Sequence, residues 1–253
     1  MTTLKLIQIT DLHLGPTADY MFRGVNTLAS LQAVLQTIDR SGLGDDLLLL
    51  TGDLASDGQP DAYRQLNQLL QVDNRRALWL PGNHDDAAVM QENLIHYPQI
   101  AVFESGNWAI LTVDSSQDGQ PGGYICEWQL QQIESYLHKL AGQFVLVAMH
   151  HSPILINSLW LDQHRIANQQ QLHRVLGAHG NVKAVVTGHI HQQHKGDWDG
   201  FAVYSTPSTC AQFQPLSDKF ALSNQPPAYR WFDLHANGHI DTAVEFVEDF
   251  NQL

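Results

Sequence analysis

Cysteine is scarce in this chain, with only two among 253 residues. Cys126 and Cys210 lie far apart and in no paired-ligand spacing, which argues against a disulfide framework and against a thiolate zinc site. The residues from Met1 to Thr3 lead directly into an apolar stretch, without the basic start of a secretion signal. We therefore expect the protein in the reducing cytoplasm.

Basic residues are scarce as well, because 13 Lys and Arg stand against 26 Asp and Glu, for a formal net charge of -13. Binding to nucleic acid or to anionic lipid depends on clustered Lys and Arg, so we expect neither partner. The densest apolar run, Leu47 to Leu50, is typical of a buried strand and far shorter than a membrane span. A small anionic substrate stays compatible with this charge, since bound divalent cations reverse the local field.

Apolar, β-branched segments alternate with segments of helical periodicity. The predicted strands are Leu4 to Thr10, Leu47 to Thr51, Ala77 to Leu80, Trp108 to Asp114, Phe144 to Met149, Val182 to Thr187 and Phe201 to Ser205. The predicted helices are Thr27 to Arg40, Asp61 to Leu70, Glu127 to Leu140 and Asn168 to Leu176. This alternation predicts an α/β fold with a mostly parallel sheet covered on both faces. Ligands of such sheets gather beyond the carboxyl ends of the strands.

The pattern changes after Thr209, where a proline-rich stretch precedes two alternating segments, Tyr229 to His235 and His239 to Phe246. We expect an antiparallel hairpin that turns at Asn237-Gly238 through a two-residue loop. Residues 205–253 would then form a C-terminal loop and hairpin that completes the second sheet. The whole chain, residues 1–253, is expected to be one domain, because a core of this size is ordinary for a single α/β domain.

Five short polar clusters each follow a predicted strand. They are Asp11-Leu12-His13, Gly52-Asp53, Gly82-Asn83-His84-Asp85, His150-His151 and Gly188-His189-Ile190-His191. Each cluster alone has an ordinary interpretation as a turn or a helix cap. Together they offer oxygen and nitrogen ligands at one edge of the fold, a set that suits manganese, iron(II) or zinc.

The spacing within the clusters suggests two ions. One metal could be held by Asp11, His13 and His191, because residues two apart in an extended segment point the same way. A second could be held by Asn83, His150 and His189, with Asp53 bridging the two. Glycines at 52, 82 and 188 would let these ligands crowd together where a Cβ would obstruct them.

In order and spacing, these clusters resemble the calcineurin-like metallophosphoesterase superfamily across nearly the whole chain. The resemblance implies a four-layer αββα sandwich, in which two mixed sheets are flanked by helices. It implies two divalent metal ions per subunit, manganese or iron(II) with zinc as an alternative, held by the ligands named above. It also implies that His84 is a catalytic imidazole that binds no metal.

The resemblance also implies a mechanism. Two cations would bind the phosphate oxygens and lower the pKa of a bridging water, so that hydroxide attacks phosphorus in line. His84 would stabilise the developing charge or protonate the departing alkoxide. We expect Asp85 to orient His84, with a carboxylate at a helix N-terminus as the alternative. His151 is expected to point to the opposite side of its strand from His150.

Further stretches resemble the bacterial class III cyclic-nucleotide phosphodiesterases, among them Gly24-Val25-Asn26-Thr27 and the segment from Tyr204 to Cys210. That resemblance implies hydrolysis of 3',5'-cyclic nucleotides such as cyclic AMP, and a homodimer. The alternatives are a glycerophosphodiesterase or broad small-phosphodiester hydrolase, and a catalytically silent scaffold on the same fold. The candidates for substrate contact are Asn83, His84, Arg23 and Phe213, with Phe22 and Tyr204 as further walls of a base pocket.

Overall fold

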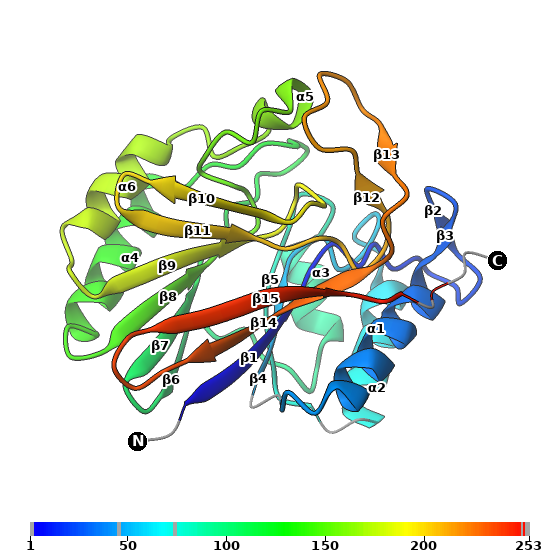
Figure 1. Cartoon of the computed structure of the whole chain (residues 1–253), viewed down its shortest axis with the longest axis horizontal. Coiled ribbons are helices and arrows are strands. Elements are labelled where there is room, and N and C mark those ends of the chain that lie inside the picture. Colours follow the sequence, from blue (N-terminus) through cyan, green and yellow to red (C-terminus); the bar gives the residue numbers. More distant parts are fainter. Residues whose placement is uncertain (1–2, 45–46, 73–74, 249, 251–253) are drawn as a thin grey trace.

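The computed structural model describes residues 3–44, 47–72, 75–248 and 250. Met1, Thr2 and residues 251–253, the outer limits of the expected single domain, lie outside the described residues. Two large sheets face each other, and helices cover their outer faces (Figure 1). This arrangement is the four-layer α/β sandwich that the resemblance implies.

The first sheet has five strands and mixes parallel and antiparallel pairs. In spatial order its strands are β15 (Ile240–Phe246), β14 (Ala228–Leu234), β1 (Leu4–Ile9), β4 (Leu47–Thr51) and β5 (Ala77–Leu80). Strands β1, β4 and β5 run parallel, so their carboxyl ends lie at the same edge. This edge carries three of the polar clusters.

The second sheet has six strands and is also mixed. In spatial order its strands are β10 (His194–Trp198), β11 (Phe201–Ser205), β9 (Val182–Thr187), β8 (Phe144–Ala148), β7 (Trp108–Thr112) and β6 (Val102–Ser105). The four central strands are parallel, and the two edge strands are antiparallel to their neighbours. The alternation of strands and helices predicted one mostly parallel sheet covered on both faces, whereas the structure has two mixed sheets. Each of them is indeed covered on both faces, by helices on one side and by the other sheet on the other.

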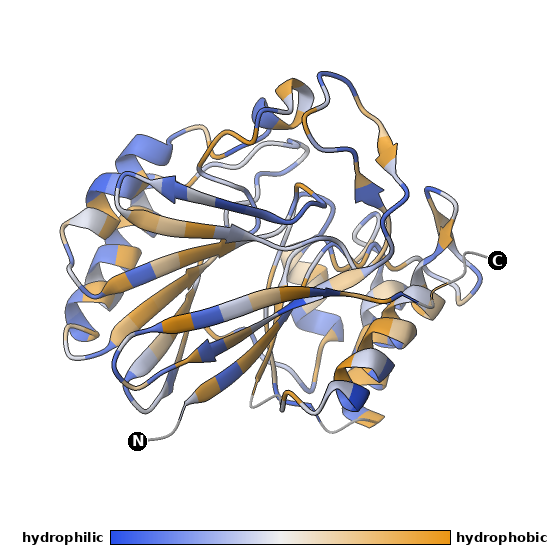
Figure 2. Ribbon diagram, viewed as in Figure 1, coloured by the Kyte–Doolittle hydropathy of each residue, from blue (hydrophilic) through white to orange (hydrophobic). Residues whose placement is uncertain are grey.

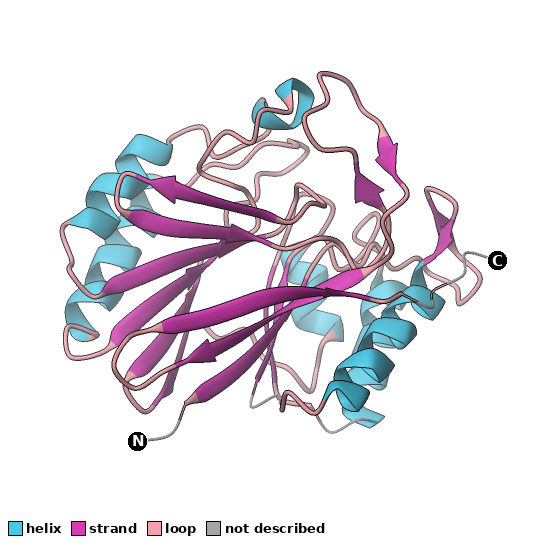
Figure 3. Ribbon diagram, viewed as in Figure 1, coloured by secondary structure: helices cyan, strands magenta, loops and turns pink. Residues whose placement is uncertain are grey.

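The helices lie outside this pair of sheets (Figure 3). They are α1 (Thr27–Ser41), α2 (Pro60–Val72), α3 (Ala87–Asn93), α4 (Glu127–Lys139), α5 (Leu159–Asp162) and α6 (Gln169–Gly177). The apolar faces of α1, α2 and α3 pack on the five-stranded sheet, and those of α4 and α6 pack on the six-stranded sheet. No helix among the described residues has both the length and the apolar character needed to cross a membrane.

Strand β4 contributes side chains to two cores, the one between the sheets and the one under the helices. Its residues Leu47 and Leu49 face the second sheet, whereas Leu48 and Leu50 face the helices. All four leucines are buried, because side chains alternate along a strand and both faces of this one are covered. An unbroken apolar run is therefore what a central strand of such a sandwich requires, and Figure 2 shows the hydrophobic strands at the centre of the molecule.

The C-terminal hairpin differs from the expectation in two ways. Strand β14 pairs antiparallel with β1, so the hairpin extends the first sheet in chain order and not the second. Its loop has three residues, since His235 donates its N–H to the carbonyl of His239 and Gly238 donates to the carbonyl of His235. Gly238 has a φ of 87°, the left-handed conformation that closes a three-residue hairpin loop after a type I turn.

Two small antiparallel pairs lie above the carboxyl edge of the sheets (Figure 1). The first joins β2 (Met21–Phe22) to β3 (Val25–Asn26), and the second joins β12 (Gln212–Phe213) to β13 (Leu222–Ser223). Each of them places an aromatic side chain against a histidine of the polar clusters, Phe22 on His13 and Phe213 on His191.

Replacement of Leu146 in β8 by Ala tests the packing between the two sheets. Leu146 has no exposed surface and lies in the core between the sheets, so Leu146→Ala should lower the free energy of unfolding by about 2 to 5 kcal/mol. The matched control is Leu159→Ala, whose side chain is 59% exposed and whose loss should cost less than about 0.5 kcal/mol. Equal midpoints for both variants in urea denaturation would contradict this account of the core.

Candidate metal centre

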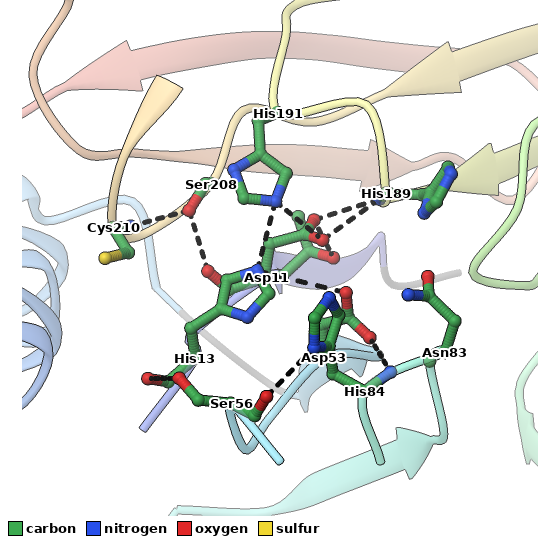
Figure 4. Close-up of polar contacts among 12 residues, drawn as sticks. Asp11, His13, Asp53, Ser56, Asn83, His84, His189, His191, Ser208 and Cys210 are labelled. Carbon is green, nitrogen blue, oxygen red and sulfur yellow. Dashed lines mark hydrogen bonds and ion pairs between the residues drawn. The ribbon is translucent and has the colours of Figure 1, made fainter. Parts of the chain in front are cut away.

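The five polar clusters converge at one place, where loops from both sheets meet. Figure 4 shows side chains of the clusters around Asp11, Asp53, Asn83 and His189 there. Three clusters follow β1, β4 and β5 of the first sheet, and two follow β8 and β9 of the second. Four overlapping groups of three described side chains bring their ligand atoms within 4.8 Å of one another. The sequence places these residues far apart, so their convergence is a product of the fold.

The first group contains Asp11, His13 and His191, all of them buried. The Nε2 atoms of His13 and His191 are 3.1 Å apart, and the Nε2 of His191 lies 3.3 Å from Oδ1 of Asp11. His191 donates its Nδ1 proton to the carbonyl of Ala211 at 2.6 Å, which leaves the lone pair of Nε2 facing the other two residues. This donor set has the chemistry of a divalent-cation site.

The second group lies around His150. Its Nε2 is 3.4 Å from Oδ2 of Asp53 and 3.3 Å from Oδ1 of Asn83, while its Nδ1 is 2.8 Å from the carbonyl of Thr51. The ring of His189 lies 5.1 Å from that of His150. Asp53 reaches both groups, because the same Oδ2 is 3.9 Å from Nε2 of His13. The oxygen and nitrogen atoms of these residues therefore fit two neighbouring cations with one shared carboxylate.

The backbone at the site is strained. Asp11, His13, Asp53, His189 and His191 all have positive φ angles, between 47° and 68°. Non-glycine residues adopt this left-handed conformation rarely, although Asp and His do so more readily than most, and each instance costs about 1 to 3 kcal/mol. Such a concentration of strained residues marks a functional site, since only the surrounding structure can hold them there.

Hydrogen bonds hold this strained backbone in place. Asp11 and His13 donate their N–H groups to the carbonyls of Gly52 and Asp53, at 3.0 and 2.9 Å. The N–H of His189 donates to both oxygens of the Asp11 carboxylate, and the N–H of His84 donates to Oδ1 of Asp53. The two buried carboxylates are thus oriented by main-chain donors from neighbouring loops.

The three glycines singled out in the sequence are places of close approach, as expected. A Cβ on Gly82 would lie 2.2 Å from Oδ1 of Asp53, and one on Gly188 would lie 2.0 Å from Oγ1 of Thr10. A Cβ on Gly52 would lie 2.5 Å from Nδ1 of His150, and the φ of Gly52 is 91°. No side chain fits at these positions without displacing a residue of the site.

The electrostatics of the site favour the protonation states of metal ligands. Burial raises the pKa of Asp53, but the nearby charges of His150 and His13 outweigh it and hold the pKa well below its usual value. Burial lowers the pKa of His13 to about 3, and it also holds the pKa of His189 well below its usual value. Metal binding requires ionised carboxylates and neutral imidazoles, and this environment supplies them at Asp53, His13 and His189. His150 differs, because burial lowers its pKa but the charge of Asp53 outweighs that effect and raises the pKa to about 9, so a cation that binds there must displace a proton.

His84 lies at the exposed side of the site, with its ring edge-on to that of His13 at 5.0 Å. Its Nδ1 is 2.9 Å from the carbonyl of Ser56, so a ring proton is donated there and Nε2 is left for chemistry. The expectation that Asp85 orients this ring was wrong. The partner of the His84 ring is a main-chain oxygen.

Asp85 has a different task. Its carboxylate accepts hydrogen bonds from the N–H groups of Leu54, Ala55 and Gly82 and from the hydroxyl of Tyr63. Burial and the charge of Asp53 raise the pKa of Asp85 to about 6. Asp85 therefore ties the loop after β4 to the loop after β5, and it acts on the site through the position of Asp53.

His151 does not point away from the site as expected. Its ring is 4.9 Å from that of His150 and 4.7 Å from that of His189, and the three residues form one of the groups that could hold a metal. The strand β8 ends at Ala148, so the alternation of side chains no longer applies at position 151. The spacing of residues in the sequence did not indicate that the chain leaves the strand conformation before His151.

Two of the proposed substrate contacts, Phe213 and Phe22, stack on histidines of the site, and Tyr204 does not. Phe213 is buried and stacks on His191 at 4.0 Å, while Arg23 is exposed with its guanidinium 4.7 Å from the ring of Phe220. Tyr204 belongs to the core between the sheets, so its assignment to a base pocket was wrong. Phe22 stacks on His13 at 4.1 Å, as Phe213 does on His191.

Comparison with known proteins finds a family model and full-length relatives that match this chain. A family model described as calcineurin-like phosphoesterase matches residues 4–193. A Haemophilus influenzae protein named 3',5'-cyclic adenosine monophosphate phosphodiesterase CpdA is 37% identical over 248 residues, which cover 97% of this chain and 90% of that protein. A Nostoc protein named 3',5'-cyclic-nucleotide phosphodiesterase is 35% identical over 246 residues, which cover 96% of this chain and 92% of that protein.

Solved structures share the fold at low sequence identity. A dimetal phosphatase from Danio rerio superimposes with a TM-score of 0.63 at 17% identity, covering 92% of this chain and 95% of its own. The Plasmodium protein GAP50, described as the anchor in the inner membrane complex, superimposes with a TM-score of 0.65 at 14% identity, covering 98% of this chain and 86% of its own. These likenesses concern the fold alone.

Replacement of Gly82 by Ala tests the close packing of the site. The new Cβ would collide with Asp53, so Gly82→Ala should bind divalent cations at least about tenfold more weakly than the parent protein. The control is Gly142→Ala, because a Cβ there meets no atom within 4 Å. Metal content after dialysis against manganese reports on the site. Thermal unfolding of the metal-free proteins shows whether the fold is intact. Unchanged metal content in Gly82→Ala would show that the packing does not matter.

Proposed function

Because the chain belongs to the calcineurin-like phosphoesterase family, we propose that it is a dinuclear metal-dependent phosphodiesterase that hydrolyses 3',5'-cyclic nucleotides such as cyclic AMP. The observation that carries the proposal is the meeting of the candidate ligands from positions 11 to 191 within one buried site. The names of relatives at 35 and 37% identity over nearly the full chain support the substrate class.

The proposed ligands divide into two sets. Asp11, His13 and His191 would hold one cation, with their ligand atoms within 4.8 Å of one another. Asn83, His150 and His189 would hold the second, and Asp53 would bridge the pair. We propose manganese or iron(II), with zinc as an alternative, because the site contains oxygen and nitrogen donors and no thiolate ligand.

The bound cations would offset the charge of the phosphodiester and activate a water as the nucleophile. The protein's own contribution is to hold the ligands of the cations in place. The two buried carboxylates are fixed by main-chain N–H groups, and the left-handed backbone directs the ligands to one point. Such preorganisation stabilises a transition state without reorganisation at the moment of reaction.

We assign the proton transfer to His84. Its Nδ1 faces the carbonyl of Ser56, so the Nε2–H of the protonated ring is available to the substrate. In a 3',5'-cyclic phosphate the departing oxygen remains on the ribose as an alkoxide. Donation of the Nε2 proton to that oxygen completes the cleavage of one P–O bond, and a positioned acid of this kind contributes about 10² to 10⁴ in rate.

The base and sugar would be held at the mouth of the site. Phe213 and Phe22 flank it from the two small strand pairs, and Arg23 contributes a cation beside the ring of Phe220. Apolar walls with a few polar groups suit a nucleobase. Asn83 and His84, which lie next to Asp53, would contact the phosphate.

We also propose that the protein is a cytoplasmic homodimer that does not bind nucleic acid. Two free cysteines suit a reducing compartment, and a net charge of -13 opposes binding to nucleic acid. The exposed apolar side chains Met21, Phe220 and Leu222 would give a second copy apolar surface to cover.

A parallel measurement of kcat/KM tests the substrate assignment. With manganese present, the enzyme should hydrolyse cyclic AMP and cyclic GMP faster than glycerophosphocholine or a simple monoester. Slow turnover of cyclic AMP beside fast turnover of glycerophosphocholine would replace the proposed activity with that of a glycerophosphodiesterase. No turnover of any of the four by the manganese-loaded protein would favour a silent scaffold.

Replacement of Asn83 by Ala tests the ligand assignment. Loss of its Oδ1 should weaken the binding of one of the two cations about 10- to 100-fold and suppress hydrolysis. His138→Ala is the control, because His138 is an exposed residue of α4. The two variants would be compared by manganese titration and by cyclic AMP hydrolysis. Equal behaviour would remove Asn83 from the site.

A further inference from the structure

His151 is a buried imidazole that the proposed mechanism leaves without a role. It has no exposed surface, and its Nδ1 lies 2.8 Å from Oγ of Ser115, which is equally buried. The same hydroxyl oxygen accepts the main-chain N–H of His151 at 3.2 Å. A Cβ on Gly123 would lie 2.7 Å from Cγ of His151, so the loop that contains Gly123 packs directly on the ring. The ring is therefore held in one orientation.

Two ring nitrogens near this point lack a partner among the described residues. They are Nε2 of His151 and Nε2 of His189, and both are buried. Their rings are 4.7 Å apart with an angle of 47° between them. Buried polar atoms in proteins nearly always have a hydrogen-bond partner, and because these two atoms do not bond to each other directly, one buried water between the adjacent rings would satisfy both.

The other histidines of the site show what His189 requires. His150 and His191 each place Nδ1 against a main-chain carbonyl, that of Thr51 and that of Ala211, and direct Nε2 at the site. A histidine that binds a metal through one nitrogen carries a proton on the other, and that proton needs an acceptor to fix the ring. For His189 the buried nitrogen without a partner is Nε2, and the adjacent ring of His151 also has a buried Nε2 without a partner.

We propose that His151 is the positioning residue of His189. One water molecule accepts the Nε2 proton of His189 and donates a hydrogen bond to Nε2 of His151, and this link leaves Nδ1 of His189 unprotonated and free to face the cations. In this arrangement Nδ1 of His151 carries its own proton and donates it to Ser115. The inference rests on the proposed function, because it assigns a role toward the second cation.

Burial supports this role for His151. The ring has no exposed surface and its Nδ1 faces the hydroxyl of Ser115, so Nε2 is the nitrogen left to accept a hydrogen bond. A carboxylate in the same position would accept a proton more strongly, but it would add a third buried negative charge beside Asp11 and Asp53. A neutral acceptor orients His189 without that cost.

Zinc binding to a set of variants tests the proposal. Zinc is diamagnetic, and its titration into the metal-free protein by calorimetry gives stoichiometry and affinity. His151→Leu should lower the affinity for one of the two zinc ions about 10- to 100-fold. His151→Gln, whose amide oxygen accepts a hydrogen bond, should recover most of the lost affinity. Ser115→Ala should weaken the same ion by less. The control is His164→Ala, since His164 is half-buried, lies 6.2 Å from the His189 ring and should leave both affinities unchanged.

A spectroscopic measurement on the parent protein keeps the test independent of how the variants fold. In the zinc-loaded protein with 15N-labelled histidine, long-range 1H–15N correlation spectra should show His189 metal-bound at Nδ1 and protonated at Nε2, with His151 protonated at Nδ1. A zinc-induced shift of Nε2 of His151 itself would make it a ligand and overturn the inference. A His189 protonated at Nδ1 would overturn it as well.

The outcomes separate the two proposals. If the parent protein fails to bind two zinc ions and to hydrolyse phosphodiesters, the proposed function fails. If the parent protein does both and His151→Leu binds zinc with the same affinity, only the role of His151 fails. Thermal unfolding of the metal-free variants shows that a lost affinity reflects the site and not a lost fold.

Discussion

The burial of two carboxylates beside a group of imidazoles is the constraint on which this structure depends. Asp11 and Asp53 are almost wholly removed from water, and a buried charge is costly unless it is paired and hydrogen-bonded. Here main-chain N–H groups of His84 and His189 donate hydrogen bonds to the two carboxylates, and the Nε2 atoms of His150 and His191 lie 3.4 and 3.3 Å from their oxygens. The arrangement concentrates negative charge at one point in a dry environment, which is what a divalent cation needs from a protein.

The two-sheet architecture is what makes this burial feasible. The parallel strands of each sheet end at the same edge, so their loops reach the site from two sides. The core between the sheets fixes the position of one sheet relative to the other. The loops then adopt backbone conformations that isolated peptides avoid, with left-handed residues at Asp11, His13 and Asp53. Rigid strands on either side of each loop hold the strain, and a rigid site is the result.

The fold itself does not determine the activity. A dimetal phosphatase and an anchor protein of a membrane complex share this architecture with the chain at 17 and 14% identity. What distinguishes a catalyst on such a scaffold is its set of side chains and the contacts that orient them. In this chain those contacts extend beyond the ligands, to the carbonyl of Ser56 behind His84, the carboxylate of Asp85 between two loops, and the Ser115–His151 pair behind His189.

The sequence by itself determined the strands, most of the helices and the candidate ligands, because apolar periodicity and glycine next to Asp, Asn or His are local signals. It missed both edge strands of the second sheet, β6 and β10, and it misjudged the partner of the C-terminal hairpin. Only the tertiary structure decided which sheet the C-terminal hairpin joins, that Asp85 connects loops and does not hold His84, and that His151 turns toward His189. The physical reason is that a side chain's partner depends on which loops the packed sheets bring together, and the spacing of residues along the chain does not contain that information.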